Sequence, residues 1–263
     1  MRILAVGDIY SVYGCECALK LIPKIKRQEH IDLVIANGEN SALGNGITPE
    51  SADMLFAAGV DVITGGNHSL RRKEIYDMLD ESPFLLRPHN MVCDYGTGYR
   101  LIDLGRYSVA VINLLGHAFI ERQETTNPFT AADELIERAK ADGAKYIFVD
   151  FHAEATGEKK ALGLYLDGRV SAIFGTHTHI PTADAQILPQ GSGYITDLGF
   201  TGVENSVLGV KSSIIINRLK SGGCEKFEAA EGKCILNACI FDIGDNGLCT
   251  AVKQVIMRED ANA

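Results

Sequence analysis

The sequence predicts a protein of the α/β class, and three observations carry that prediction. Short apolar, β-branched runs alternate with amphipathic stretches up to residue 179, which is typical of a sheet built from βαβ units. Beyond that point strand-like runs follow one another, separated by glycine and asparagine, so that end should be antiparallel. No linker rich in proline, glycine and serine divides the 263 residues. We therefore expect one domain over residues 1–263.

The first part of the chain shows the alternation most clearly. An amphipathic helix is expected near residues 15–28, where apolar residues recur at helical spacing. A second helix should open at Thr48, which can cap it, with Pro49 at the first helical position, and should end at Gly59. The strands expected among these helices are residues 3–6, 33–36 and 62–64.

The middle and C-terminal parts are predicted from the same signals. YRLIDL and YSVAVINLLG read as a hairpin joined at Gly105 and Arg106, which would form a sheet edge. TAADELIERAKADGA reads as a helix with Thr130 and Asp133 at its capped start, and YIFVDF as the strand that follows. The last expected strands are YITDLG, SSIIINRL, KCILNACIFDI and TAVKQVIM.

Composition and charge limit the class of function. With 46% hydrophobic and 22% charged residues the chain should be folded, and its net charge of −9 argues against gripping long polyanions through a general basic surface. The charge does not exclude binding of small nucleotides. The apolar run in MRILAVGDIY is too short for a signal peptide or a membrane span, so we expect no membrane association. Seven cysteines, odd in number and without a CxxC pair, suit a reducing cytoplasm.

Polar side chains that can bind metal follow four of the expected strands and the apolar run AIF at 172–174, which reads as a fifth. In an open α/β sheet ligands bind outside the carboxyl ends of the strands, so these groups could converge although about 170 positions separate them. The pair in GTHTHIPTAD would point the same way in an extended segment. The candidates are Asp8, Glu39, Asn40, Asn67, His68, His152, His177 and His179.

Each candidate also has a purely structural explanation. Asp8 could cap the segment that follows it, and Asn40 and Asn67 could be ordinary turn residues. His152 could be a hydrogen-bonded core histidine, and the two histidines of GTHTH could be polar residues at a strand end. The joint pattern is what favours one shared site, because five strand ends would otherwise finish in metal-binding side chains by accident.

The donor types point to a centre with two ions. Imidazole with carboxylate and carboxamide oxygens suits iron, manganese or zinc, and no cysteine occurs in these clusters. Seven candidate ligands exceed the needs of one ion that keeps a position open for substrate. Glu39 is the natural bridge because its carboxylate has two oxygens.

At this point the sequence resembles the calcineurin-like metallophosphoesterases, whose signature runs from an early aspartate through GNH to GHxH. The matching stretches are GD at 7–8, GNH at 66–68 and GTHTH at 175–179. GENSALGNGIT, VDFHAEAT, ALGLYLDGRVSAIFGTHTHIPTAD and YITDLGFTG resemble the bacterial YmdB-type phosphodiesterase branch over nearly the whole chain. The resemblance implies the fold of that superfamily, an αββα sandwich of two packed mixed β-sheets flanked by helices. It also implies action on 2′,3′-cyclic nucleotides.

Carried over residue by residue, the resemblance places the candidate ligands on two ions. Asp8, Asn40 and His179 would bind one, Asn67, His152 and His177 the other, and Glu39 would bridge them. Tyr10 stands where the wider superfamily has a histidine after the first aspartate, and Glu39 replaces a bridging aspartate. YSVYGCE and RPHNMV also depart from the branch pattern, which leaves the substrate-binding residues unknown. Tyr10, Tyr13 and Phe200 could meet a base or simply pack.

The expected chemistry follows from the charges. A hydroxide that bridges two metal ions, most simply iron although manganese and zinc suit the same ligands, would attack the cyclic phosphate. His68, beside Asn67 and free of metal, would donate the proton to the leaving 2′ oxygen and so leave a 3′-nucleotide. Three alternatives stay open: a phosphomonoesterase, another cyclic-nucleotide phosphodiesterase, or a non-catalytic metal-binding regulatory protein. We further expect a homo-oligomer, and a role in RNA-related regulation stays open.

Overall fold

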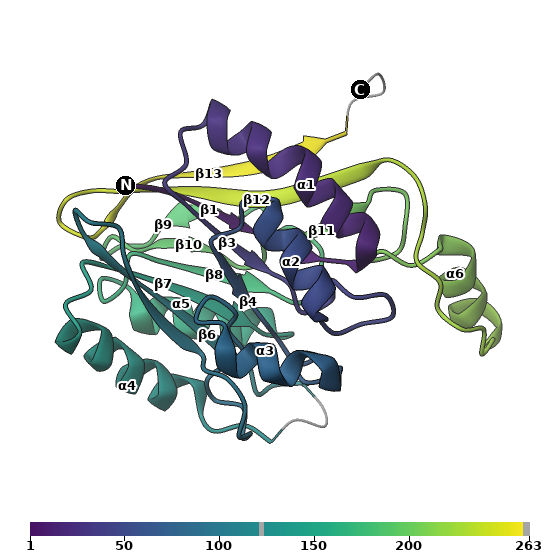
Figure 1. The fold of residues 1–263 in the computed structure, drawn as a ribbon, viewed down its shortest axis with the longest axis horizontal. Helices are drawn as coiled ribbons and strands as arrows, with labels where there is room; N and C mark the ends of the chain where they lie inside the picture. The colour runs from purple at the N-terminus through teal and green to yellow at the C-terminus, as the bar shows by residue number, and fades with distance from the viewer. Residues whose placement is uncertain (121–123, 260–263) are drawn as a thin grey trace.

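The computed structural model describes residues 1–120 and 124–259 and shows two mixed β-sheets packed face to face, with helices on their outer faces (Figure 1). This is the αββα arrangement that the resemblance implies.

The first sheet carries the N-terminal strands. Its order is β2-β11-β12-β1-β3-β4, and β13 pairs with β12. β1, β3 and β4 are parallel to one another, whereas β12 is antiparallel to its partners β1, β11 and β13. The strands are β1 (Arg2–Val6), β2 (Asp8–Ile9), β3 (Leu33–Asn37), β4 (Val62–Thr64), β11 (Phe200–Val203), β12 (Cys234–Ile243) and β13 (Cys249–Arg258).

The second sheet comes from the middle of the chain, in the order β5-β6-β7-β8-β10-β9. Its four inner strands are parallel, and the antiparallel strands β5 and β9 form its edges. The predicted hairpin is therefore confirmed as β5 and β6, with β5 at the edge. The strands are β5 (Tyr99–Asp103), β6 (Ser108–Leu115), β7 (Tyr146–His152), β8 (Ala172–Thr176), β9 (Gln186–Ile187) and β10 (Gly193–Ile195).

The helices pack on the outsides of the two sheets. α1 (Ser11–Gln28) and α2 (Pro49–Ala57) cover the first sheet, and α4 (Pro128–Ala141) and α5 (Thr156–Leu166) cover the second. The remaining helices are η1 (Lys73–Ile75), α3 (Tyr76–Glu81) and α6 (Ser212–Ser221).

Three apolar cores correspond to the three interfaces between these four layers. Successive side chains of a strand point to opposite faces, and β1 shows the result. Leu4 and Val6 pack in the core beneath α1 and α2, whereas Ile3 and Ala5 pack in the core between the sheets. The core between the sheets also contains Phe148 of β7, so burial on both faces explains why these strands read as continuous apolar runs.

The N-terminal caps of two helices were predicted from the sequence, one of them correctly. The Thr48 side chain accepts a hydrogen bond from the Ser51 backbone N–H and Pro49 opens α2, as predicted. The predicted cap of α4 is wrong. Asn127 caps that helix and Pro128 occupies its first turn, two residues before Thr130, because Asn127 Oδ1 accepts from the Phe129 N–H at 2.8 Å.

The segment SSIIINRL is also a correction, because it forms the helix α6 and not a strand. Its three isoleucines favoured a strand, but strand propensity depends on packing against neighbouring strands. α6 projects from the body at the right of Figure 1, and only Ile214 of this helix is buried. Gly222 ends it in the left-handed conformation, a local helix stop.

One cysteine pair departs from the expectation for a reducing compartment. Cys17 of α1 and Cys234 of β12 form a disulfide with Cα atoms 5.9 Å apart, while the other five cysteines are free. None of the helices within residues 1–120 and 124–259 combines the length and apolar character needed to cross a membrane.

Candidate metal centre

The polar strand ends of the two sheets meet at one place. Asp8 follows β1, Glu39 and Asn40 follow β3, and Asn67 follows β4 in the first sheet. His152 ends β7, and the GTHTH loop with His177 and His179 follows β8 in the second sheet. Because these strands are parallel within each sheet, their carboxyl ends share an edge.

Glu39 lies at the middle of the cluster. Its Oε2 accepts a hydrogen bond from the His68 backbone N–H at 2.9 Å and lies 3.4 Å from His152 Nε2. Its Oε1 accepts from the Asn40 side-chain amide at 2.7 Å. The carboxylate thus lies between residues of both sheets, a position from which its two oxygens can contact two ions.

The second group of predicted ligands gathers around His152. Asn67 Oδ1 lies 3.0 Å from His152 Nε2, and His177 Nδ1 lies 3.0 Å from the same nitrogen. The ligand atoms of Glu39, His152 and His177 all lie within 4.8 Å of one another, a separation suited to sharing a metal ion.

Asp8 and His179 complete the cluster on the side of the first sheet. Asp8 Oδ2 accepts from the His177 backbone N–H at 2.9 Å, and Asp8 Oδ1 lies 3.8 Å from His179 Nε2. Both residues are buried, yet Asp8 Oδ1 and His179 Nδ1 have no hydrogen-bond partner within the described residues. Buried polar atoms are normally paired, so a carboxylate oxygen in this position suits a cation.

The pKa values of the cluster differ from one candidate ligand to the next. Burial raises the pKa of Asp8. Burial and the nearby His152 together lower the pKa of His177 to about 3, which keeps its imidazole neutral, the form that binds metal. Glu39 behaves oppositely: burial would raise its pKa, but His152 and His68 together outweigh burial and hold the pKa well below its usual value. In turn, burial would lower the pKa of His152, but Glu39, Asp8 and Asp150 together outweigh burial and raise it to about 9, so this ring would release a proton on binding a metal ion.

Close packing also explains one glycine of the GNH motif. A Cβ on Gly66 would collide with Glu39 Oε2 and with the His152 ring. Only glycine therefore lets the chain pass between these two side chains. A glycine at the end of β4 thus makes room for the crowded site.

His68 lies at the mouth of the cluster. Its Nδ1 is 3.2 Å from Glu39 Oε1 and 3.1 Å from Asn40 Oδ1, and its Nε2 is 3.3 Å from Asn67 Nδ2. Its side chain is 28% exposed, in contrast to the buried Glu39. Contact with the cluster together with access to solvent is the position that proton donation to a bound substrate requires.

A buried ion pair that the sequence analysis missed supports the histidine loop. Lys159 Nζ lies 2.6 Å from Asp197 Oδ2, and both side chains are buried. The same oxygen accepts from the Thr178 backbone N–H at 3.1 Å, between two histidines with positive φ values of 106° at His177 and 64° at His179. Such backbone conformations persist only when the surroundings hold them.

A second missed network orients His152. The Thr176 hydroxyl lies 2.9 Å from His152 Nδ1 and donates to Asp150 Oδ1 at 2.7 Å, while the Asn37 side chain donates to Asp150 Oδ2 at 3.1 Å. Burial raises the pKa of Asp150 to about 6, and its hydrogen bonds oppose that rise. Partners of this kind fix the orientation of a ligand histidine. The DFH in YIFVDFH is the signal that could have revealed Asp150.

The aromatic residues near the site either pack against the ligand side chains or line a cavity beside them. The Phe200 ring stacks on His179 with centroids 5.7 Å apart and is buried, so it packs against the cluster. Tyr10, with its ring centroid 6.0 Å from that of His179, and Tyr13 both line a neighbouring cavity. Glu154, which sequence reasoning did not single out, places a half-exposed carboxylate 3.1 Å from His177 Nε2.

Comparisons with known proteins agree with this site. The sequence model described as "YmdB-like protein" matches residues 4–255. A Bacillus subtilis (strain 168) protein named "2′,3′-cyclic-nucleotide 2′-phosphodiesterase" is 42% identical over 99% of this chain and 98% of its own. A crystal structure of a phosphatase from Mycoplasma pneumoniae superposes with a TM-score of 0.92 at 33% identity, over 100% of this chain and 95% of that one. A hypothetical protein from Thermus thermophilus superposes with a TM-score of 0.91 at 39% identity, over 99% of this chain and 100% of its own. The chain therefore belongs to the YmdB-like family.

Proposed function

We propose that this protein is a dinuclear metal-dependent phosphodiesterase that opens 2′,3′-cyclic nucleotides by breaking the bond to the 2′ oxygen, which leaves 3′-nucleotides. The observation that carries the proposal is the convergence of the seven predicted ligand side chains at one site, with unpaired buried atoms on Asp8 and His179. The name of the Bacillus subtilis relative, 42% identical over almost the whole chain, supports the substrate class.

The ligand assignment is part of this proposal. Asp8, Asn40 and His179 would hold one ion, Asn67, His152 and His177 the other, and Glu39 would contact both. When bound, the ions supply positive charge to the phosphate and acidify a water molecule. The chain itself contributes a rigid frame, because Asp8 accepts from the His177 backbone and Glu39 from the His68 backbone.

His68 would act as the general acid. The leaving 2′ oxygen needs a proton as its bond to phosphorus breaks, and imidazole can donate one near neutral pH. Contacts with Glu39 and Asn40 orient the ring through Nδ1, which leaves Nε2, beside the Asn67 side chain, as the nitrogen that would donate the proton. Its partial exposure gives the ring access both to the substrate and to solvent for recovering the proton.

An assay of the purified protein tests the activity. With added manganese or ferrous iron we expect hydrolysis of 2′,3′-cAMP and release of 3′-AMP, identified by chromatography against authentic 2′-AMP and 3′-AMP. Preferred hydrolysis of 3′,5′-cAMP would instead indicate another cyclic-nucleotide phosphodiesterase. Preferred hydrolysis of para-nitrophenyl phosphate would indicate a phosphomonoesterase. Turnover of none of these substrates by metal-loaded protein would favour a metal-binding regulatory protein.

Metal identity and location belong to the same proposal. Imidazole, carboxylate and carboxamide donors without a thiolate support iron, with manganese and zinc as alternatives that metal analysis distinguishes. The five free cysteines, Cys224 exposed among them, support a cytoplasmic location, and the Cys17–Cys234 disulfide opposes it. Titration of thiols in unfolded protein from the cytoplasm should give seven if the location is right.

Two further expectations concern the whole chain. The core shared by both sheets supports one domain over residues 1–263, since neither sheet buries its inner face alone. The exposed side chains of Ile216 and Leu219 on α6 support a homo-oligomer, because they form an apolar surface on a helix that stands away from the body. Light scattering measures that state directly.

A further inference from the structure

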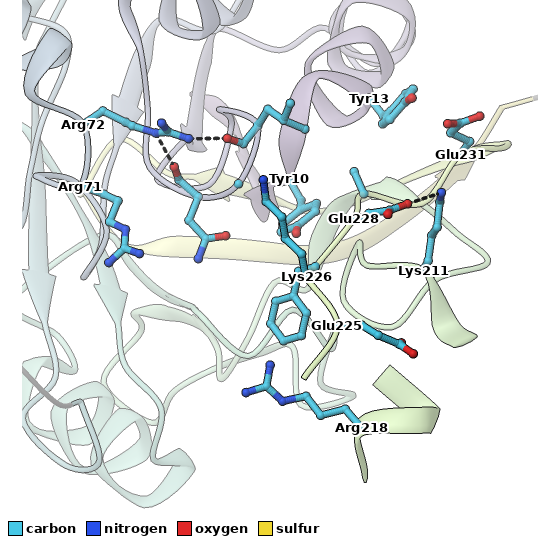
Figure 2. Close-up of a pocket in the computed structure, with 15 residues that line it drawn as sticks. Tyr10, Tyr13, Arg71, Arg72, Lys211, Arg218, Glu225, Lys226, Glu228 and Glu231 are labelled. Carbon is cyan, nitrogen blue, oxygen red and sulfur yellow. Dashed lines mark hydrogen bonds and ion pairs between the residues drawn. The ribbon is translucent and has the colours of Figure 1, made fainter. Parts of the chain in front are cut away.

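A second feature lies beside the metal centre, a groove of about 800 Å³ between the loop after β3 and the segment after α6 (Figure 2). We define the basic groove by six of the residues that line it: Tyr10, Arg71, Arg72, Arg218, Lys226 and Phe227. The proposed reaction uses none of these side chains.

The basic groove adjoins residues of the metal centre at both of its walls. On one wall Tyr10 pairs with Asn40 through an isolated β-bridge, and its ring lies beside that of His179. On the other wall the Arg71 backbone N–H donates to the His68 carbonyl at 2.9 Å, so the arginine follows the proposed acid within one turn. A ligand anchored at the metal centre can therefore extend into the groove.

The groove carries more positive than negative side chains, whereas the whole chain is negatively charged. Its lining carries five cationic side chains against three acidic ones, in a protein of net charge −9. Lys211 is neutralised by Glu228 at 2.6 Å, and Arg72 donates to backbone carbonyls of the neighbouring loop. The side chains of Arg71 and Lys226 have no hydrogen-bond or ion-pair partner within the described residues and face the same hollow (Figure 2). Such a local excess of positive charge suits an anionic ligand.

Aromatic rings alternate with these cations. Tyr10 and Tyr13 line one side of the groove, and Phe227, half exposed, lines the other. The Arg218 guanidinium lies 4.9 Å from the centre of the Phe227 ring. Cations that follow a phosphate backbone, combined with aromatic rings that stack on bases, are the features by which proteins bind single-stranded nucleic acid.

We propose that the basic groove binds the nucleotides on the 5′ side of the reacting ribose, so that the preferred substrate is a short oligoribonucleotide ending in a 2′,3′-cyclic phosphate. This inference rests on the proposed function. A 2′,3′-cyclic mononucleotide carries one phosphate, which the metal centre takes, and its ribose and base are neutral. Each further nucleotide adds one anionic phosphodiester and one base, the two groups that the cations and rings of the groove bind.

Kinetics on two substrates of different length test the inference. For the metal-loaded wild type we expect kcat/KM at least about tenfold higher for a tetraribonucleotide with a 2′,3′-cyclic phosphate end than for 2′,3′-cAMP. Arg71→Gln and Lys226→Gln should each lower that ratio about three- to tenfold, mainly through KM, and flatten the dependence of log kcat/KM on log salt by about 0.7. Lys73→Gln is the matched control, an exposed cation two residues after Arg71 that does not line the groove, and should leave the ratio unchanged.

A binding measurement separates this inference from the proposed function. Fluorescence anisotropy of a labelled tetraribonucleotide with a 3′-phosphate end reports on the groove whether or not the protein turns over substrate. Binding that Arg71→Gln weakens, without hydrolysis of either substrate, would support the groove as a binding site for oligoribonucleotides and remove the proposed activity. A wild-type ratio near one, or variants that bind the tetranucleotide as tightly as wild type, would overturn the inference even if 2′,3′-cAMP is hydrolysed.

Discussion

The metal centre and the basic groove lie side by side but are built in opposite ways. The centre consists of short side chains that are mostly buried, that follow strands of both sheets and that contact one another, as Glu39 and His152 do. The groove consists of long side chains from loops, from α6 and from the segment after it, and Arg71 makes no side-chain contact of this kind within the described residues. The difference separates two tasks: a fixed geometry for bond breaking, and adaptable charge for holding ligands of variable length.

This contrast has an energetic basis. Groups buried without partners cost free energy, so the centre is held by a second layer of hydrogen bonds and by the Lys159–Asp197 pair. Exposed cations cost little in the folded protein and act over distance on an approaching anion. Changes in the centre should therefore affect all substrates alike, whereas changes in the groove should affect long substrates more.

Loss of His68 is the sharpest test of the centre and has the largest expected effect. In His68→Ala, kcat should fall about 10²- to 10⁴-fold on 2′,3′-cAMP and on the tetranucleotide alike, with metal content unchanged. Bis(para-nitrophenyl) phosphate should lose much less, because its leaving group departs without a proton. His30→Ala, an exposed histidine that precedes β3 and so lies at the end of that strand opposite to Glu39, is the control. An equal loss on both kinds of substrate would remove the acid role.

Loss of the buried lysine tests whether the centre depends on its support. Lys159→Met leaves the Asp197 carboxylate buried without its partner, which should lower the free energy of unfolding by about 3–5 kcal/mol in urea titrations. Adding Asp197→Asn should recover part of the loss, since the unpaired charge disappears. Lys160→Met next to it, whose ammonium lies over the Tyr194 ring, should cost less than about 1 kcal/mol. A cost for Lys159→Met no larger than that of Lys160→Met would contradict the comparison.

A change at Asp184 should have the smallest effect, and that effect should depend on pH. Burial would raise the pKa of this carboxyl, but hydrogen bonds from Thr196 and Thr182 outweigh burial and lower it. A lowered pKa contributes stability above the ordinary value of about 3.9 and loses it as the pH falls through the lowered value. Asp184→Asn should therefore be less stable than wild type at pH 7, and the difference in urea midpoint should shrink as the pH falls below about 3.9. A difference that grows on acidification would show that the carboxylate is not what Thr196 and Thr182 hold.

Much of the scaffold could be predicted because its signals are local. The apolar run of β1, the Thr48 cap and the hairpin at Gly105 depend on residues close in sequence, and each lies where we expected. The helix α6 was not predicted, because isoleucine favours a strand only where a neighbouring strand is available to pair with it. Its surroundings, not its composition, decided its structure.

The candidate site was predictable in its ligands but not in its supports. Metal-binding side chains after parallel strands form a recognisable pattern, because the fold brings carboxyl ends to one edge. No such pattern marks Lys159. It is one of two lysines in the sequence of a helix, and its partner Asp197 is 38 residues away. Nothing in either local sequence marks them as a pair.

The sequence by itself determined the strands, most of the helices and the kinds of atoms available to bind metal, because periodicity and donor chemistry are properties of short segments. Only the tertiary structure decided that Asp8 keeps an unpaired oxygen among the described residues, that Lys159 is neutralised in the core, and that Arg71 and Lys226 face one hollow. These depend on distances between segments far apart in the chain, and burial and charge act through those distances.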